Sequence, residues 1–82
     1  MIAKEIILKS DALNNESIRP MIVQKACTYD SVIELILDNK CVNAKSIMGV
    51  MALPFEEGME ITIKADGSDE ASAIDGMSEL LG

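Results

Sequence analysis

Apolar and polar residues alternate in residues 1–9 and 60–65, as is typical of half-buried β-strands, whereas residues 31–37 are nearly all apolar. The predicted strands span residues 1–9, 31–37, 40–43 and 60–65. Elsewhere, apolar residues recur every three or four positions. This spacing predicts a helix from Ser17 to Tyr29 and a last helix that begins at Ser68 or Asp69. A turn-rich loop, residues 10–16, precedes the first helix.

The segment between the third and fourth strands predicts a short helix headed by Ser46. A serine in front of an apolar run is a good helix N-cap, because its hydroxyl accepts a backbone N–H that has no partner inside the helix. The helix cannot be long, since Gly49 weakens its middle and Pro54 ends it. So short an element cannot bury all of its other apolar residues, which include Ile47, Met48 and Met51.

The predicted order is βαββαβα, an α+β fold in which a four-stranded antiparallel sheet carries three helices on one face. No linker or repeat divides the chain, so we expect residues 1–82 to form a single domain. Asp38 and Asn39 tolerate positive φ and predict a two-residue hairpin loop. If Ile33 and Ile61 face the helices, three branched residues lie on the open face of the sheet: Ile7, Val32 and Ile36. They indicate either self-association into a homodimer or the scattered surface apolar residues of a monomer.

Composition narrows the class of protein. The net charge is −7 with only seven basic residues, which argues against a nucleic-acid partner, since that partner requires a basic patch. No apolar run is long enough to cross a membrane and no signal-peptide pattern is present, so we expect a cytoplasmic protein without a membrane partner. Cys27 and Cys41 lack both C-x-x-C and zinc-ligand spacing, so we expect reduced cysteines and no metal. The chain contains no histidine.

Residues 43–51 read N-A-K-S-I-M-G-V-M. This segment resembles the regulatory-serine segment of the HPr family, the small phosphocarriers of the bacterial sugar phosphotransferase system. The resemblance extends more weakly to A-C-T-Y-D at 26–30, D-N-K-C-V-N at 38–43 and G-M-E-I-T-I-K-A-D-G at 58–67. It implies the open-faced β-sandwich of that family, in agreement with the order βαββαβα.

The chain departs from the family at S-I-R-P, residues 17–20. The family's motif is H-A-R-P, whose histidine carries the phosphoryl group, and Arg19 and Pro20 match its last two positions. Ser17 stands at the place of the histidine, or Asn15 if the sequences are counted without a gap. Neither residue can hold a phosphoryl group at the transfer potential of a phosphohistidine, so the carrier reaction is excluded and no catalytic residue is expected. We expect Ser17 to cap the helix and not to accept phosphate.

The resemblance implies that Ser46 is a regulatory phosphorylation site for an HPr kinase/phosphorylase. It also implies a set of partner-binding residues: Arg19, Lys45, Ile47, Met48 and Met51. Each residue has a plainer interpretation as well. A capping serine stabilises its helix by about 1 kcal/mol without any phosphate, lone basic residues are usually solvated, and the apolar residues can belong half to the core.

The family's known variant without the histidine is the catabolite-repression protein Crh, which this sequence resembles in keeping Ser46 and losing the histidine. The resemblance implies a non-enzymatic protein of carbon catabolite repression that needs no cofactor. Phosphorylated on Ser46, it would bind a transcriptional regulator of the catabolite control type and would not bind DNA directly. Two alternatives stay open: a constitutive HPr-like binding module without phosphorylation, and a phosphotransfer component that uses another acceptor.

Overall fold

A computed structural model describes residues 1–8, 17–56 and 58–81. Over these residues the chain forms strands and helices in the predicted order βαββαβα. The strands are β1 (Ile2–Ile7), β2 (Val32–Leu37), β3 (Lys40–Asn43) and β4 (Glu60–Asp66). The helices are α2 (Ile18–Cys27), α3 (Ile47–Met51) and α4 (Glu70–Leu81). The predicted loop at 10–16 lies outside the described residues.

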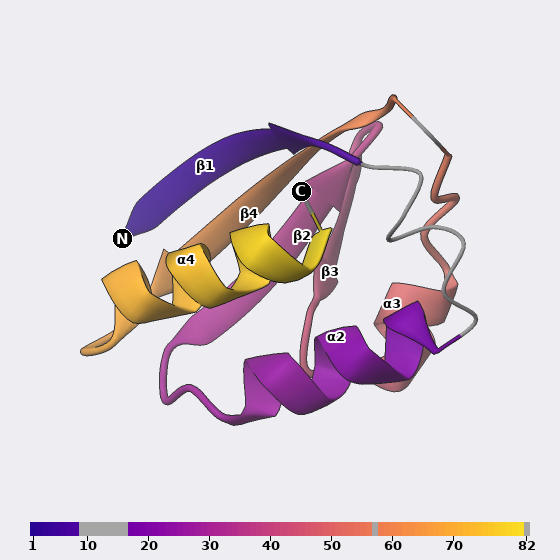
Figure 1. Ribbon diagram of the computed structural model, residues 1–82. Helices are drawn as coiled ribbons and strands as arrows, with labels where there is room; N and C mark the ends of the chain where they lie inside the picture. Colours follow the sequence, from indigo (N-terminus) through magenta and orange to yellow (C-terminus); the bar gives the residue numbers. More distant parts are fainter. Residues whose placement is uncertain (9–16, 57, 82) are drawn as a thin grey trace.

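One antiparallel sheet contains these strands, in the order β1-β4-β2-β3. The helices lie together on one face of the sheet, where α4 packs against β1 and β4, and α2 contacts both α3 and α4 (Figure 1). Side chains alternate along β2 and β4, so Ile33, Leu35 and Ile63 point beneath the helices and are fully buried. The predicted open-faced α+β sandwich and its inward face are therefore confirmed.

The uncovered face of the sheet carries the three branched apolar residues that the alternation predicts there. Ile7 and Val32 are 51% and 58% exposed, and Ile36 is half-buried. Ile7 pairs with Glu60 at one end of β4, whereas Val32 pairs with Asp66 at the other end. The two most exposed of the three therefore lie at opposite ends of the sheet and do not form a common apolar patch.

A carboxylate joins the start of β2 to the start of α4. The Asp69 carboxylate accepts the backbone N–H groups of Asp30 and Ser31, at 2.8 and 2.9 Å, and also the Ser31 hydroxyl. The Ser31 hydroxyl, followed by the backbone donors, lowers the pKa of Asp69, because these bonds favour the charged form. We call this set of bonds the Asp69 clasp. Asp69 is one of the two residues predicted to cap α4; its carbonyl accepts the Ala73 N–H at 2.9 Å, while its carboxylate serves the clasp.

Candidate functional site

Ser46 lies where the chain leaves β3 and enters α3. The turn is held by Asn43, whose side-chain oxygen accepts the backbone N–H of Lys45 at 2.9 Å. Ser46 itself has an extended backbone, and its hydroxyl accepts the Gly49 N–H at 3.3 Å, which confirms the predicted N-cap. The residue is half-buried. Ser46 thus caps the helix and remains partly exposed to solvent.

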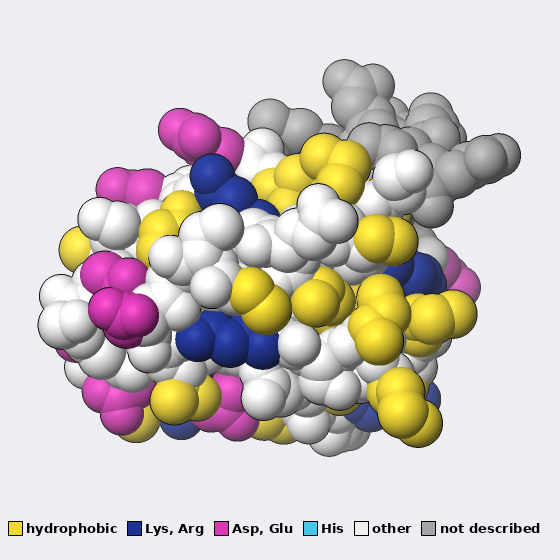
Figure 2. Space-filling model, turned by 90° about the horizontal axis from the view of Figure 1, so that it is seen from below, with side chains coloured by type: hydrophobic (Ala, Val, Ile, Leu, Met, Phe, Trp, Pro, Cys, Tyr) yellow, Lys and Arg dark blue, Asp and Glu magenta, His cyan; other side chains and the backbone are white. Residues whose placement is uncertain are grey.

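The helix α3 exposes three of the residues predicted to bind partners. Ile47, Met48 and Met51 are 42%, 82% and 65% exposed, whereas Val50 is the buried residue of this helix. Because α3 has little more than one turn, only a small part of it can face the core. Figure 2 looks at the side that carries α2 and α3, and apolar side chains gather at the end where α3 lies. We call Ile47, Met48 and Met51 the α3 surface.

Arg19, in the first turn of α2, reaches the C-terminal end of α3. Its guanidinium donates to the carbonyls of Val50 and Leu53, at 2.5 and 2.9 Å. It also lies over the Phe55 ring, 4.5 Å from the ring centre. The residue that the family resemblance would place on a phosphate or a partner is therefore bonded to its own chain.

Ser17 occupies the N-cap position of α2, and Pro20 falls in the first turn of that helix as predicted. The expected cap itself is wrong, because the Ser17 side chain makes no cap hydrogen bond. Its φ of −93° and ψ of 8° differ from the extended backbone that N-cap residues typically have. The helix begins there all the same, since the Ser17 carbonyl accepts the Met21 N–H at 3.0 Å. The alternative position, Asn15, lies outside the described residues.

Lys45, immediately before Ser46, turns toward α2. Its ammonium donates to the Tyr29 carbonyl at 2.8 Å, two residues beyond the end of α2. The residue is half-buried, so it is not the freely solvated charge of its plainer interpretation. Lys45 and Arg19 thus connect α2 and α3 at two separate points.

The charges of the chain are unevenly distributed along the sequence. Residues 17–29 and 39–55 hold four of the seven basic residues and none of the fourteen acidic ones. These two segments contain α2, β3 and α3. The stretches around α2 and α3 therefore hold no acidic residue in a protein whose net charge is −7. This signal was present in the sequence but is hidden when only the total charge is considered.

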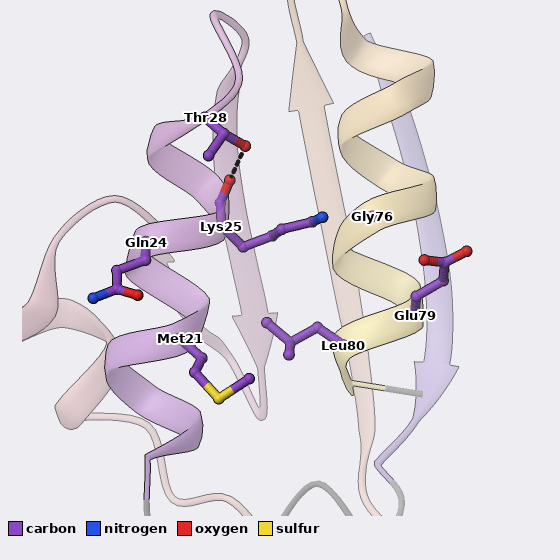
Figure 3. Close-up of a pocket in the computed structure, with 7 residues that line it drawn as sticks. All are labelled: Met21, Gln24, Lys25, Thr28, Gly76, Glu79 and Leu80. Atoms are coloured by element: carbon purple, nitrogen blue, oxygen red, sulfur yellow. Dashed lines mark hydrogen bonds between the residues drawn. The ribbon is translucent and has the colours of Figure 1, made fainter.

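A shallow groove of about 480 Å³ lies between α2 and α4 (Figure 3). Met21 and Leu80 point toward one another across it, Lys25 extends toward Gly76, and Glu79 points away. The sequence pattern does not predict this groove, because α2 and α4 lie far apart along the chain. The lining contains no cluster of titratable or nucleophilic side chains, so the groove is not the candidate site.

The described part of the chain contains neither a candidate metal site nor a candidate membrane-spanning helix. Within it, no three His, Cys, Asp or Glu side chains come together in a way that could hold a metal ion. None of the described helices has the length and apolar character needed to span a membrane. Cys27 and Cys41 are free thiols at the surface. Cys41 donates to a Glu34 carboxylate oxygen at 3.1 Å, and this bond raises the pKa of the thiol.

Comparison with known proteins identifies relatives along most of the chain. Residues 19–82 match the family model described as the PTS HPr component phosphorylation site. The matched range includes Arg19, Lys45, Ser46 and the α3 surface, and it begins after Ser17.

Solved structures of HPr proteins and of Crh have the same fold. HPr-C-His from Thermoanaerobacter tengcongensis is 36% identical with a TM-score of 0.90, over 99% of this chain and 91% of that one. The phosphocarrier protein HPr from Bacillus anthracis str. Ames is 32% identical with a TM-score of 0.89, over 99% and 96%. Crh from Bacillus subtilis, crystallised as a dimer with a swapped domain, is 32% identical with a TM-score of 0.72, over 98% and 85%.

Proposed function

This chain belongs to the HPr family, and from that premise we propose that it is a regulatory protein of the Crh type. An HPr kinase/phosphorylase transfers phosphate from ATP to the Ser46 hydroxyl. The phosphorylated protein then binds a transcriptional regulator of the catabolite control type. In this proposal the protein is cytoplasmic, has no catalytic activity of its own, needs no cofactor and contacts neither DNA nor a membrane.

The observation that carries the proposal is the position of Ser46 beside the α3 surface. Ile47, Met48 and Met51 are exposed directly after the serine, so a change at Ser46 alters the surface that a partner would meet. A phosphate there adds nearly two negative charges at neutral pH. It adds them within residues 39–55, a segment with two basic residues and no acidic one.

The absence of histidine supports regulation over phosphate transport. A phosphocarrier needs a bond that transfers phosphate readily, and the chain has no imidazole with which to form it. A serine phosphate is a stable ester, which suits a signal that a kinase writes and a phosphorylase removes. Ser46 supports this role because it is partly exposed, at the start of a helix that exposes Ile47, Met48 and Met51.

The direct test is the intact mass of the protein after incubation with ATP and an HPr kinase/phosphorylase. We expect one added phosphate on the wild type and none on Ser46→Ala. No added phosphate on a folded wild type would contradict the proposal and favour the constitutive binding module. The phosphotransfer alternative is tested in parallel, since it requires that the protein accept phosphate from the upstream carrier enzyme of the phosphotransferase system.

The constitutive module is the second candidate, because the α3 surface is already exposed without a phosphate. Under this alternative, Ser46→Ala keeps its partner and its effect in the cell. Under the leading proposal, Ser46→Ala loses both.

We also propose that the protein forms a homodimer, in line with its swapped-dimer relative Crh. Sedimentation velocity over a range of concentrations should show a dimer. A monomer at the highest concentration would contradict this part of the proposal and leave the Ser46 switch untouched.

A further inference from the structure

Two cationic side chains connect α2 and α3 in opposite directions. Arg19 starts in the first turn of α2 and donates to the Val50 and Leu53 carbonyls at the C-terminal end of α3. Lys45 starts in the turn before α3 and donates to the Tyr29 carbonyl just beyond the C-terminal end of α2. Each cation therefore donates to backbone carbonyls at or just beyond the C-terminal end of the neighbouring helix, where the C=O groups carry partial negative charge.

We propose that Arg19 and Lys45 are positioning residues, which hold the α3 surface in one orientation by reciprocal capping of the two helices. This role is separate from the direct partner or phosphate contacts that the family resemblance implies for them. The proposal rests on the proposed function in one respect, that a partner meets the α3 surface. The capping itself is a property of the free protein and is tested without any partner.

The helix α3 needs such contacts because burial gives it little support. It has five residues, of which Val50 is the buried one, and helices this short are unstable when isolated. Its N-terminal cap is a single neutral bond from Gly49 to the Ser46 hydroxyl, at 3.3 Å. The C-terminal end is held by two bonds from a charged donor, and charge-assisted bonds are roughly twice as strong as neutral ones.

The guanidinium of Arg19 is suited to this position in a way that a lysine is not. Its planar fork reaches two carbonyls at once, and its face stacks on an aromatic ring. Here both features are used, on Val50 and Leu53 and on the Phe55 ring. An arginine placed only to meet a partner would not need three contacts within its own chain.

The methyl signals of three methionines can show whether the capping holds α3 in place. Met48 and Met51 lie on α3 and are 82% and 65% exposed, whereas Met77 is fully buried beneath α4. The experiment is a methyl NMR spectrum of methionine-labelled protein, compared between the wild type and Arg19→Gln. The matched control is Lys40→Gln, which removes an exposed cation from β3.

We expect Arg19→Gln to shift or broaden the Met48 and Met51 signals and to leave the Met77 signal in place. Amide hydrogens of α3 should also exchange faster, on the order of tenfold for each charge-assisted bond lost. Arg19→Lys keeps the charge without the fork and should give an intermediate result.

Two results would overturn the proposal. One is a set of Met48 and Met51 signals in Arg19→Gln that matches those of the Lys40→Gln control. The other is a Met77 signal that moves as much as the α3 signals, which would indicate a general role in folding. Lys45→Gln provides a second, independent variant in case Arg19→Gln does not fold, and it should change the same α3 signals. Because none of these spectra involves phosphate, the capping and the Ser46 switch can fail separately.

Discussion

The helices α3 and α4 lie on the same face of the sheet but are held there in different ways. Five of the twelve residues of α4 are buried, against one of the five residues of α3. The contrast is clearest in one residue type, since Met77 of α4 is fully buried and Met48 of α3 is 82% exposed. Burial fixes α4, whereas hydrogen bonds from Arg19 and to Ser46 fix α3. A helix placed by polar contacts can leave its apolar side chains free for a partner.

The largest effect is expected from truncating the same side chain in the two helices. Met77→Ala should lower the free energy of unfolding by roughly 2–5 kcal/mol, because it removes buried contacts and leaves a cavity. Met48→Ala should change it by less than about 0.5 kcal/mol, as is usual for surface substitutions. Urea denaturation of both variants measures the difference. Equal losses would show that α3 depends on burial as much as α4 does, and the comparison would fail.

A smaller effect is expected from adding one carbon to each helix. A Cβ at Gly76 of α4 would lie 1.9 Å from the Tyr29 hydroxyl oxygen, whereas a Cβ at Gly49 of α3 would meet the Val42 Cβ at 3.2 Å. Gly76→Ala should therefore cost about 1–3 kcal/mol through overpacking, although alanine is the better helix former. Gly49→Ala is the matched variant and should cost less.

Thermal or urea unfolding compares the two alanine variants. Adding Tyr29→Phe to Gly76→Ala should restore part of the lost stability, because it removes the oxygen that lies closest to the new carbon. If Gly49→Ala is the more destabilising of the two, α3 is packed more tightly than α4, which would contradict the comparison.

The smallest effect is expected at the Asp69 clasp, and its pH dependence lies on the acid side. The clasp lowers the pKa of Asp69 below its ordinary value of 3.8 in the folded protein. Its contribution is therefore complete above that value and is lost as the pH falls through the lower folded pKa. Asp69→Asn should be less stable at neutral pH and should show a weaker loss of stability toward acid.

The control for the clasp is Asp75→Asn, which removes an exposed carboxylate from the same helix. Unfolding followed between neutral and acid pH checks both variants. An Asp69→Asn profile parallel to that of the wild type would mean that other carboxylates govern the acid side.

The fold was predictable because it depends on local patterns. Ile33 and Leu35 lie two positions apart on β2, so they point to the same face of the sheet, and both side chains are buried. The cap at Ser46 follows from a serine before an apolar run, and its hydroxyl does accept the Gly49 N–H. The same rule fails at Ser17, because residue type alone does not set the φ and ψ that a cap requires.

The contacts that position the candidate site were not predictable in this way. Arg19 lies 31 residues before Val50, and Lys45 lies 16 residues after Tyr29. Both bonds form because α2 lies beside α3 in the folded chain. The periodicity of apolar residues does not predict which helices are neighbours. Sequence reasoning therefore named Arg19 and Lys45 as candidates but did not predict the carbonyls of their own chain to which they donate.

In the proposed switch, a phosphate on Ser46 turns the α3 surface into a binding site for a regulator. The most direct measurement is calorimetric titration of a catabolite-control-type repressor with the phosphorylated and the unphosphorylated protein. The account predicts that phosphorylation tightens binding by at least about tenfold, a coupling within the range usual for allosteric and covalent switches. It also predicts that Met48→Ala weakens the phosphorylated complex. Equal affinity of the two forms would contradict the switch and identify the protein as a constitutive binding module.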